Sequence, residues 1–559
     1  MACRYHAASA SLTELIVVKD ETFAPLLAPD AVYEIDDSYE IWYYENSRIP
    51  PLSVRRYGYD AIPMCYGLTE QREMEQSGIL QLQNINALSL KGQGVFVAII
   101  DTGIRYEDST FRNPDGTTRI YALWDQTGEE TTSTTEELCY GVRYSQTQIN
   151  EALFSGRPQE LVPQTDENGH GTFLASIACG GKDSVADFVG AAPLAELVVV
   201  KLKPAKPYLR EFYGIPEELP CYAETDIMAA VSYANQIATS QKRPLVILLG
   251  LGTSSGNHSG SGPLNGYLDL LARRIGRVIV TATGNEAGSR RHVFGNNLSE
   301  LLPQRVEMNV EADMQTLCLE FWSSAPAELS IAVQSPTGER FPSRMELEGR
   351  DVTFTFVLEG TTVEISRRFV GRARRDQLVF LRFRNIVRGI WTMLIYPVGY
   401  ATGYFHGWLP MQGMTQADVF FLASDPDTTL CGPSDAHNVI SVGGYDGQTL
   451  GLYVASGRGF DADNSVKPDV IAPAVAITGK TLFGTYERRS GTSMAAAITA
   501  GACAQLLEWS ILDGNEPQAN GIDIKNRLIR SAIRQENQTY PNQTQGYGRL
   551  NAYEAIRLR

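Results

Sequence analysis

The stretch VFVAIIDTGI, residues 95–104, decides the fold class of this chain. An uncharged apolar run leads into Asp101, and such a run is typical of a strand that is buried on both faces. Similar Val- and Ile-rich runs recur between helical patterns, at 196–202, 244–252, 277–284 and 438–444. This alternation predicts an α/β fold with a doubly wound, mostly parallel sheet. Ligands bind beyond the carboxyl ends of the strands in such sheets, and Asp101 stands at such an end.

Two segments depart from this alternation. Residues 297–427 consist of short alternating strands with turn residues between them, which predicts an inserted antiparallel β-sandwich or barrel. Residues 1–68 contain three runs that look like strands, at 13–20, 39–46 and 53–60, and predict a small β-rich or mixed unit. The expected division is therefore 1–68, a first α/β part at 69–296, the insertion at 297–427 and a second α/β part at 428–559.

The composition limits the classes of partner. The net charge of −16 leaves the chain without a basic nucleic-acid footprint, so no nucleic-acid partner is expected. No window reaches 18 uninterrupted apolar residues, and we expect no membrane span. The first residues lack an apolar run of signal-peptide length, so we expect synthesis in the cytoplasm without a signal peptide. The eight cysteines are scattered without CxxC spacing, and we expect no disulfide framework, metal or cofactor.

Asp101 stands in an Asp-Thr-Gly triplet that fits two protease chemistries. In aspartic proteases the triplet supplies one of two carboxylates that share a proton, so a single chain needs a second copy. This chain has no second copy, and a dimer of half-sites is disfavoured by its length and its α/β pattern. The other interpretation is an aspartate that orients a histidine.

Two further motifs supply a histidine and a nucleophile. His170 lies in ENGHGTFLAS, residues 167–176, at the expected start of a helix. Alone this motif is a weak signal, because a histidine there is more often a cap or a surface residue. Ser493 lies in RSGTSMAAAITAGACA, residues 489–504, and opens a helix whose N-terminus would direct backbone N–H groups at an anion. An Ala-rich core helix would explain the alanines but not the Gly-Thr-Ser before them.

Together, in the order Asp101, His170, Ser493, the three motifs closely resemble those of the subtilisin-like serine protease family. The resemblance implies that Ser493 is the nucleophile and His170 its general base. It implies that Asp101 fixes the tautomer of the histidine.

Two more segments match this family. TATGNEAG, residues 281–288, resembles the oxyanion-hole segment and implies that Asn285 donates to the oxyanion; the alternative for Asn285 is a turn residue. LLGLGTSSG, residues 248–256, resembles the strand that pairs with substrate and forms a wall of the first specificity pocket. Its central residues are Gly250, Leu251 and Gly252, and the family often has Ser at the first of them. A buried strand with a glycine bulge fits the same residues.

A narrower resemblance, carried by residues 190–218 and 244–260, is to the Csp-type germination proteases of clostridia and their relatives. It implies an N-terminal prodomain, an inserted jelly-roll domain and an association with spores. It further implies limited proteolysis that activates the precursor of a spore cortex-lytic hydrolase during germination.

In this family the prodomain is a partner of its own protease. The resemblance implies that its tail, about residues 59–69, lies in the active-site cleft, and we expect self-cleavage between Pro63 and Gln83. The alternative function is a Csp-like regulatory or sensing protein with a protease fold and little turnover, since some members lack triad residues. The intact triad of this chain favours the enzyme.

Overall fold

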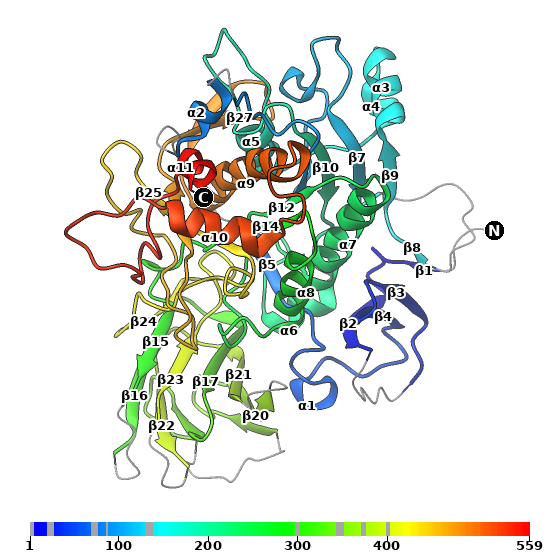
Figure 1. The fold of residues 1–559 in the computed structure, drawn as a ribbon. Coiled ribbons are helices and arrows are strands. Elements are labelled where there is room, and N and C mark those ends of the chain that lie inside the picture. Colours follow the sequence, from blue (N-terminus) through cyan, green and yellow to red (C-terminus); the bar gives the residue numbers. More distant parts are fainter. Residues whose placement is uncertain are drawn as a thin grey trace.

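A computed structural model describes the chain over these residues: 5–19, 27–68, 77–84, 88–128, 138–296, 302–341, 351–370, 376–398 and 403–558. Figure 1 shows a central sheet wrapped by helices, a β-rich part that extends from one end of it, and a small β unit near the N-terminus.

An eight-stranded sheet forms the centre of the molecule, in the order β26-β25-β14-β12-β6-β10-β7-β9. Its neighbouring strands are parallel, except for β7 and β9 at one edge. The strands are β6 (Phe96–Asp101), β7 (Ile120–Asp125), β9 (Val142–Ser145), β10 (Glu196–Lys201), β12 (Leu245–Leu249), β14 (Arg277–Ala282), β25 (Ile440–Tyr445) and β26 (Val470–Pro473). This sheet confirms the expected α/β class.

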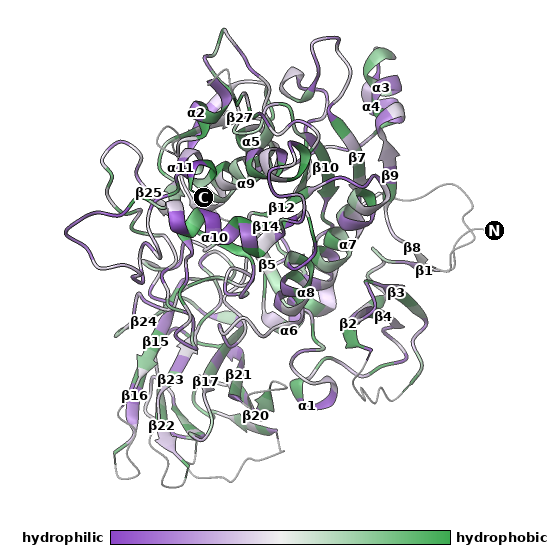
Figure 2. Cartoon of the chain, in the orientation of Figure 1, coloured by the Kyte–Doolittle hydropathy of each residue, from purple (hydrophilic) through white to green (hydrophobic). Residues whose placement is uncertain are grey.

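Helices cover both faces of the sheet. They are α7 (Glu224–Ser240) and α8 (Pro263–Ala272) on one face, and α5 (His170–Cys179) and α9 (Thr492–Leu507) on the other. Successive side chains of β6 point to opposite faces, so Phe96 joins the core of α7 and α8 while Val97 joins the core of α5 and α9. Burial on both sides explains why the strands are continuous apolar runs, which Figure 2 shows as hydrophobic colour along the sheet.

The other elements of this part are short and lie around the sheet. They are α2 (Ile79–Asn84), η1 (Ser109–Phe111), β8 (Leu138–Cys139), α3 (Gln146–Phe154), α4 (Pro158–Leu161), α6 (Pro207–Tyr213), β11 (Tyr222–Ala223), β13 (Leu251–Gly252), β27 (Ile477–Lys480), β28 (Tyr486–Arg489), η2 (Glu508–Leu512), α10 (Gly521–Ser531) and α11 (Ala552–Arg557).

One helix among the described residues, Thr492–Leu512, has the length and apolar composition of a membrane span. It comprises α9 and η2, and 78% of its most apolar window is buried inside the protein. All residues of α9 are buried against the central sheet and α5, so the apolar composition is that of a core helix.

Between β14 and β25 the chain forms two antiparallel sheets that enclose a core of their own. The six-stranded sheet has the order β15-β23-β17-β21-β20-β19, and the four-stranded sheet has the order β18-β22-β16-β24. The strands are β15 (His292–Gly295), β16 (Gln304–Val310), β17 (Met314–Ser323), β18 (Leu329–Gln334), β19 (Val352–Thr355), β20 (Thr362–Val370), β21 (Asp376–Ile386), β22 (Gly389–Pro397), β23 (Phe405–Trp408) and β24 (Val419–Phe421).

The N-terminal unit is a three-stranded antiparallel sheet with the order β2-β4-β3. Its elements are β1 (Tyr5–His6), which pairs with β8, and β2 (Leu12–Val18), β3 (Ala31–Glu34), β4 (Tyr39–Glu45) and α1 (Val54–Tyr57). The strand expected at 53–60 is wrong: Ser53 caps a short helix there, because its side chain accepts a hydrogen bond from the N–H of Arg56. The β-branched and aromatic content of this run resembled a strand, and the cap decided otherwise.

Four buried charged side chains join the N-terminal unit to the central part. The carboxylate of Glu14 contacts the Nζ atoms of Lys203 at 3.0 Å and Lys206 at 2.7 Å, and Lys203 contacts Asp226 at 2.7 Å. Burial opposes the ionisation of Glu14, but the two lysines outweigh it and lower the pKa of Glu14 to about 2. The hydroxyl of Thr225 adds a hydrogen bond to the same carboxylate at 2.6 Å. Glu14 neutralises the buried lysines only while the N-terminal unit is docked. This ion cluster therefore holds the unit against the central part.

Replacing Glu14 tests this attachment. Glu14→Gln leaves Lys206 buried without its carboxylate, and we expect the free energy of unfolding to fall by about 3–5 kcal/mol in denaturant titrations. The matched control is Glu34→Gln in the same unit, whose solvent-screened ion pair with Lys19 should leave the free energy of unfolding nearly unchanged. Equal losses in the two variants would contradict the role of the buried cluster.

Candidate active site

Asp101 ends β6, and its side chain is only 1% exposed at the carboxyl edge of the sheet. Its Oδ1 and Oδ2 atoms lie 2.8 and 2.9 Å from Nδ1 of His170, and Oδ1 also accepts the N–H of Thr102 at 2.8 Å. A carboxylate can only accept, so Nδ1 of the histidine carries the proton. Nε2 is therefore the basic nitrogen of this ring.

The carboxylate of Asp166 organises the loop that carries His170. Its Oδ1 accepts the N–H of Gly169 at 2.7 Å, and its Oδ2 accepts the N–H and hydroxyl of Thr172 at 2.9 and 2.6 Å. The hydroxyl of Thr102, the residue after Asp101, also donates to Oδ1 at 2.8 Å. One carboxylate thus fixes the first turn of α5 against the end of β6.

The helix of His170 approaches the strand end as closely as a glycine allows. A Cβ at Gly171 would lie 3.2 Å from Cβ of Asp101, and it would meet the carbonyl oxygen of Gly103 closer than real Cβ atoms come. The second glycine of Gly-His-Gly therefore permits the contact between the imidazole and the carboxylate.

Ser493 is the second residue of α9 and is fully buried. Its hydroxyl donates to the carbonyl oxygen of Gly250 at 3.1 Å. Ser493 lies in the first turn of α9, so its backbone N–H points toward the N-terminal end of the helix, where helices bind anions.

Gly250 lies between His170 and Ser493. A Cβ at Gly250 would be 3.3 Å from Cε1 of His170, 3.4 Å from Cβ of Ser493 and 2.5 Å from Cδ1 of Leu174. The structure therefore brings Asp101, His170 and Ser493 into one cluster from three distant parts of the chain. It also explains why a glycine stands at this position, because Leu174 fills the space that a Cβ would need.

Asn285 follows β14 and reaches the start of α9. Its Oδ1 accepts the N–H of Thr492 at 3.2 Å, across 207 residues of sequence, and lies 3.4 Å from the hydroxyl of the same residue. Only an oxygen can accept from an N–H, so the amide nitrogen is the other end of the side chain. The site thus holds an amide donor one residue from Ser493.

The N-terminal unit continues into a strand that lies on the expected substrate strand. β5 (Cys65–Leu68) stands between β11 and β13 in an antiparallel three-stranded sheet. On one side Leu68 and Gly67 face Leu251 and Gly252, and on the other side Cys65 faces Ala223. As this pairing proceeds along β5, it advances toward Gly250 and therefore toward Ser493. Thr69, the last residue of the expected tail, lies outside the described residues.

Two buried carboxylates hold the residues before β5. Glu224 accepts the N–H of Met64 at 3.1 Å, and burial raises the pKa of Glu224 to about 7. Glu320 of β17 accepts the hydroxyl of Tyr59 at 2.8 Å and the N–H of Gly256 at 3.0 Å, and burial raises its pKa as well. Glu320 thus ties the N-terminal segment, the loop after β13 and the inserted sheets together.

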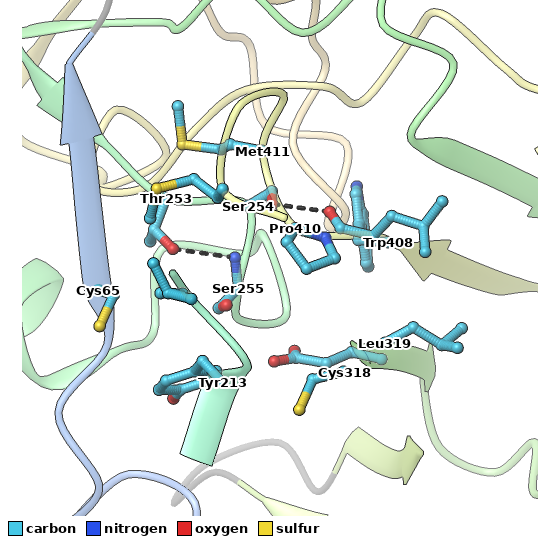
Figure 3. Close-up of a pocket in the computed structure, with 14 residues that line it drawn as sticks. Cys65, Tyr213, Thr253, Ser254, Ser255, Cys318, Leu319, Trp408, Pro410 and Met411 are labelled. Atoms are coloured by element: carbon cyan, nitrogen blue, oxygen red, sulfur yellow. Dashed lines mark hydrogen bonds between the residues drawn. The ribbon is translucent and has the colours of Figure 1, made fainter. Parts of the chain in front are cut away.

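A cavity of about 30 Å³ lies beside β5, where these three parts meet. Figure 3 shows the residues that line it. Cys65 borders it from β5, Tyr213 from α6 and Cys318 from β17. The loop after β13 closes it through the hydroxyl of Ser254, which donates to the carbonyl oxygen of Leu409 at 2.8 Å.

Comparison with known proteins places these motifs in a family. A model of the subtilase family matches residues 92–309 and 413–548, more than half of the chain. The unmatched interval lies inside the two inserted sheets. Among solved structures the chain is similar to the CspB protease of Clostridium perfringens, with 29% sequence identity and a TM-score of 0.75. That similarity covers 86% of this chain and 95% of the other.

The motifs did not reveal every residue that shapes the site. Asp166 was missed, although an Asp shortly before a helix start is a signal for capping. Leu174 and Glu320 were missed as well, because each acts on a residue far from it in the sequence.

The contact between Gly250 and Leu174 yields a double-variant test. Gly250→Ala adds a methyl group that His170, Ser493 and Leu174 leave no room for, and we expect peptidase kcat to fall about 10- to 100-fold. Adding Leu174→Val removes the tightest contact, and we expect it to restore most of the loss.

The control is Gly288→Ala, at an exposed position where a Cβ meets no atom within 4 Å. It should leave kcat and the free energy of unfolding nearly unchanged. Full activity of the Gly250→Ala variant, or no recovery with Leu174→Val, would refute the packing argument.

Proposed function

Because the chain belongs to the subtilase family of serine proteases, we propose that it cleaves peptide bonds with Ser493, His170 and Asp101. The observation that carries the proposal is the contact of Nδ1 of His170 with both oxygens of Asp101, while the same imidazole and the side chain of Ser493 both lie next to Gly250. Nε2 of His170 takes the proton of the Ser493 hydroxyl as the oxygen attacks the substrate carbonyl. The protonated imidazole is stabilised by Asp101 and returns the proton to the leaving amine.

The attack places a negative charge on the carbonyl oxygen of the substrate. In our proposal the Nδ2 amide of Asn285 and the backbone N–H of Ser493 donate to this oxyanion. Thr492 supports this role, because its N–H donates a hydrogen bond to Oδ1 of Asn285 and thereby orients the side-chain amide. Water then hydrolyses the ester of Ser493 by the same proton transfers.

Substrate binds as a strand in this proposal. Leu251 and Gly252 offer backbone groups for antiparallel pairing, and β5 occupies that position in the structure. Glycine at 250 and 252 lets the substrate backbone come close to the site.

We infer that the N-terminal segment is a prodomain and that the chain cleaves itself beyond Leu68, the last residue of β5. The register of β5 supports this position, because the pairing runs toward Ser493 as the chain continues. The interval expected for cleavage, 63–83, includes residues 69–76, which lie outside the described residues. Glu14 and Glu224 would keep the fragment docked after the cut.

We propose that the two inserted sheets form a jelly-roll domain. This domain contacts the prodomain tail through Glu320. The proposed limits remain a prodomain at 1–68, a catalytic domain at 69–296 and 428–559, and an insertion at 297–427.

The likeness to the CspB protease supports a role in spores. We propose that the protein is spore-associated and activates the precursor of a cortex-lytic hydrolase by limited proteolysis during germination. Incubation of such a precursor with the protein tests this substrate. One Ser493-dependent cut is expected, and either no cut or general degradation would contradict the proposal.

Labelling with a fluorophosphonate tests the nucleophile. The probe should label the self-cleaved protein and should not label Ser493→Ala, because only an activated serine reacts with it. Ser441→Ala, at another buried serine of the sheet, should keep the label. Intact mass should show two fragments for the wild type and one full-length chain for Ser493→Ala. A full-length, unlabelled wild type would overturn the proposal.

Asn285→Ala tests the oxyanion donor. We expect kcat to fall about 10²- to 10³-fold, or about 3 kcal/mol of transition-state stabilisation, with little change in KM. Asn515→Ala, an exposed position in the turn after the helix of Ser493, serves as the control. A change confined to KM would argue for substrate binding in place of oxyanion stabilisation.

A further inference from the structure

Two thiols lie on neighbouring segments beside the active-site cleft, one on β5 and the other directly before β11. Cys65 is the first residue of β5, and Cys221 comes directly before β11. Cys65 is opposite Ala223 in the ladder, so Cys221, two residues earlier, belongs to the same face. Both are free, buried cysteines, and each thiol shifts the pKa of the other.

The surroundings favour the thiolate of Cys221. The hydrogen bond from Cys65 lowers the pKa of the Cys221 thiol, with a further contribution from the guanidinium of Arg210. Arg210 is held nearby by hydrogen bonds to the carbonyl oxygens of Ala205 at 2.8 Å and Leu219 at 2.9 Å. Burial raises the pKa of the Cys65 thiol, so Cys221 is the thiol of the pair that ionises more readily. A thiolate beside a thiol is the arrangement from which disulfides form.

We propose that Cys65 and Cys221 form a reversible disulfide that fastens β5 in the cleft and blocks the protease. The block rests on the proposed function, since β5 occupies the place proposed for substrate. One sulfur belongs to the prodomain tail and the other to the catalytic part. The disulfide therefore bridges the proposed cut after Leu68 and keeps the fragment covalently attached after self-cleavage.

The oxidant is a peroxide, and the chemistry balances with hydrogen peroxide. The thiolate of Cys221 attacks one peroxide oxygen, the O–O bond breaks, and hydroxide leaves to give a sulfenic acid. The sulfur of Cys65 then attacks the sulfur of Cys221, the S–O bond breaks, and the thiol proton leaves with the oxygen as water. Two thiols and one peroxide thus give one disulfide and two waters.

The bond is tested first in Ser493→Ala, where no self-cleavage or activity is needed. The uncut variant is treated with hydrogen peroxide, remaining thiols are alkylated after unfolding, and its peptides are mapped. We expect a peptide pair joined through Cys65 and Cys221 that dithiothreitol separates. Recovery of both cysteines in alkylated form would overturn the proposal, whether or not the wild type is a protease.

The block is tested in the self-cleaved wild type. After peroxide we expect the N-terminal fragment to stay attached on a non-reducing gel, and peptidase activity to fall at least about 10-fold and return with dithiothreitol. Cys221→Ser and, independently, Cys65→Ala should lose the attachment and the response to peroxide. Cys318→Ser, which removes the other thiol that borders the cavity beside β5, should respond like the wild type. A disulfide that leaves activity as high as in oxidised Cys221→Ser would overturn the block.

Discussion

The site depends on a carboxylate that is buried where a parallel strand ends. Asp101 is surrounded by protein, so its charge must be balanced by donors, and the Nδ1 proton of His170 supplies the main one. That requirement fixes how close α5 must come, and Gly171 makes the approach sterically possible. It also fixes the loop before the helix, where Asp166 gathers the donors of the first turn. The orientation of the imidazole is thus a property of the fold, present before any substrate arrives.

Close packing is the second constraint, and small residues meet it. The serine helix lies fully inside the protein and is built largely of small residues, which let it pack closely against α5 and the sheet. Gly250, which lies beside both the imidazole and the serine, leaves room for Leu174.

The parts of the structure that repeat or that form local motifs could be predicted from the sequence. The run at 95–100 became β6, and Asp101, His170 and Ser493 were recognisable from the glycines and small residues beside them. Contacts that depend on register between distant segments were invisible, because nothing local marks them. The cluster of Glu14 with Lys203, the bond from Tyr59 to Glu320 and the thiol pair belong to this group. The run at 53–60 shows the opposite failure, since one capping serine outweighed its strand-like composition.

β5 is hydrogen-bonded along both of its edges, to β11 and to β13. A polypeptide that takes its place must be fully extended over about four residues and must expose the backbone on both sides. No helix and no strand already paired in a sheet can offer this. A folded protein therefore becomes a target only where a linker or loop can detach from its own structure. Selectivity then lies as much in the local unfolding of the target as in the side chains around the cut.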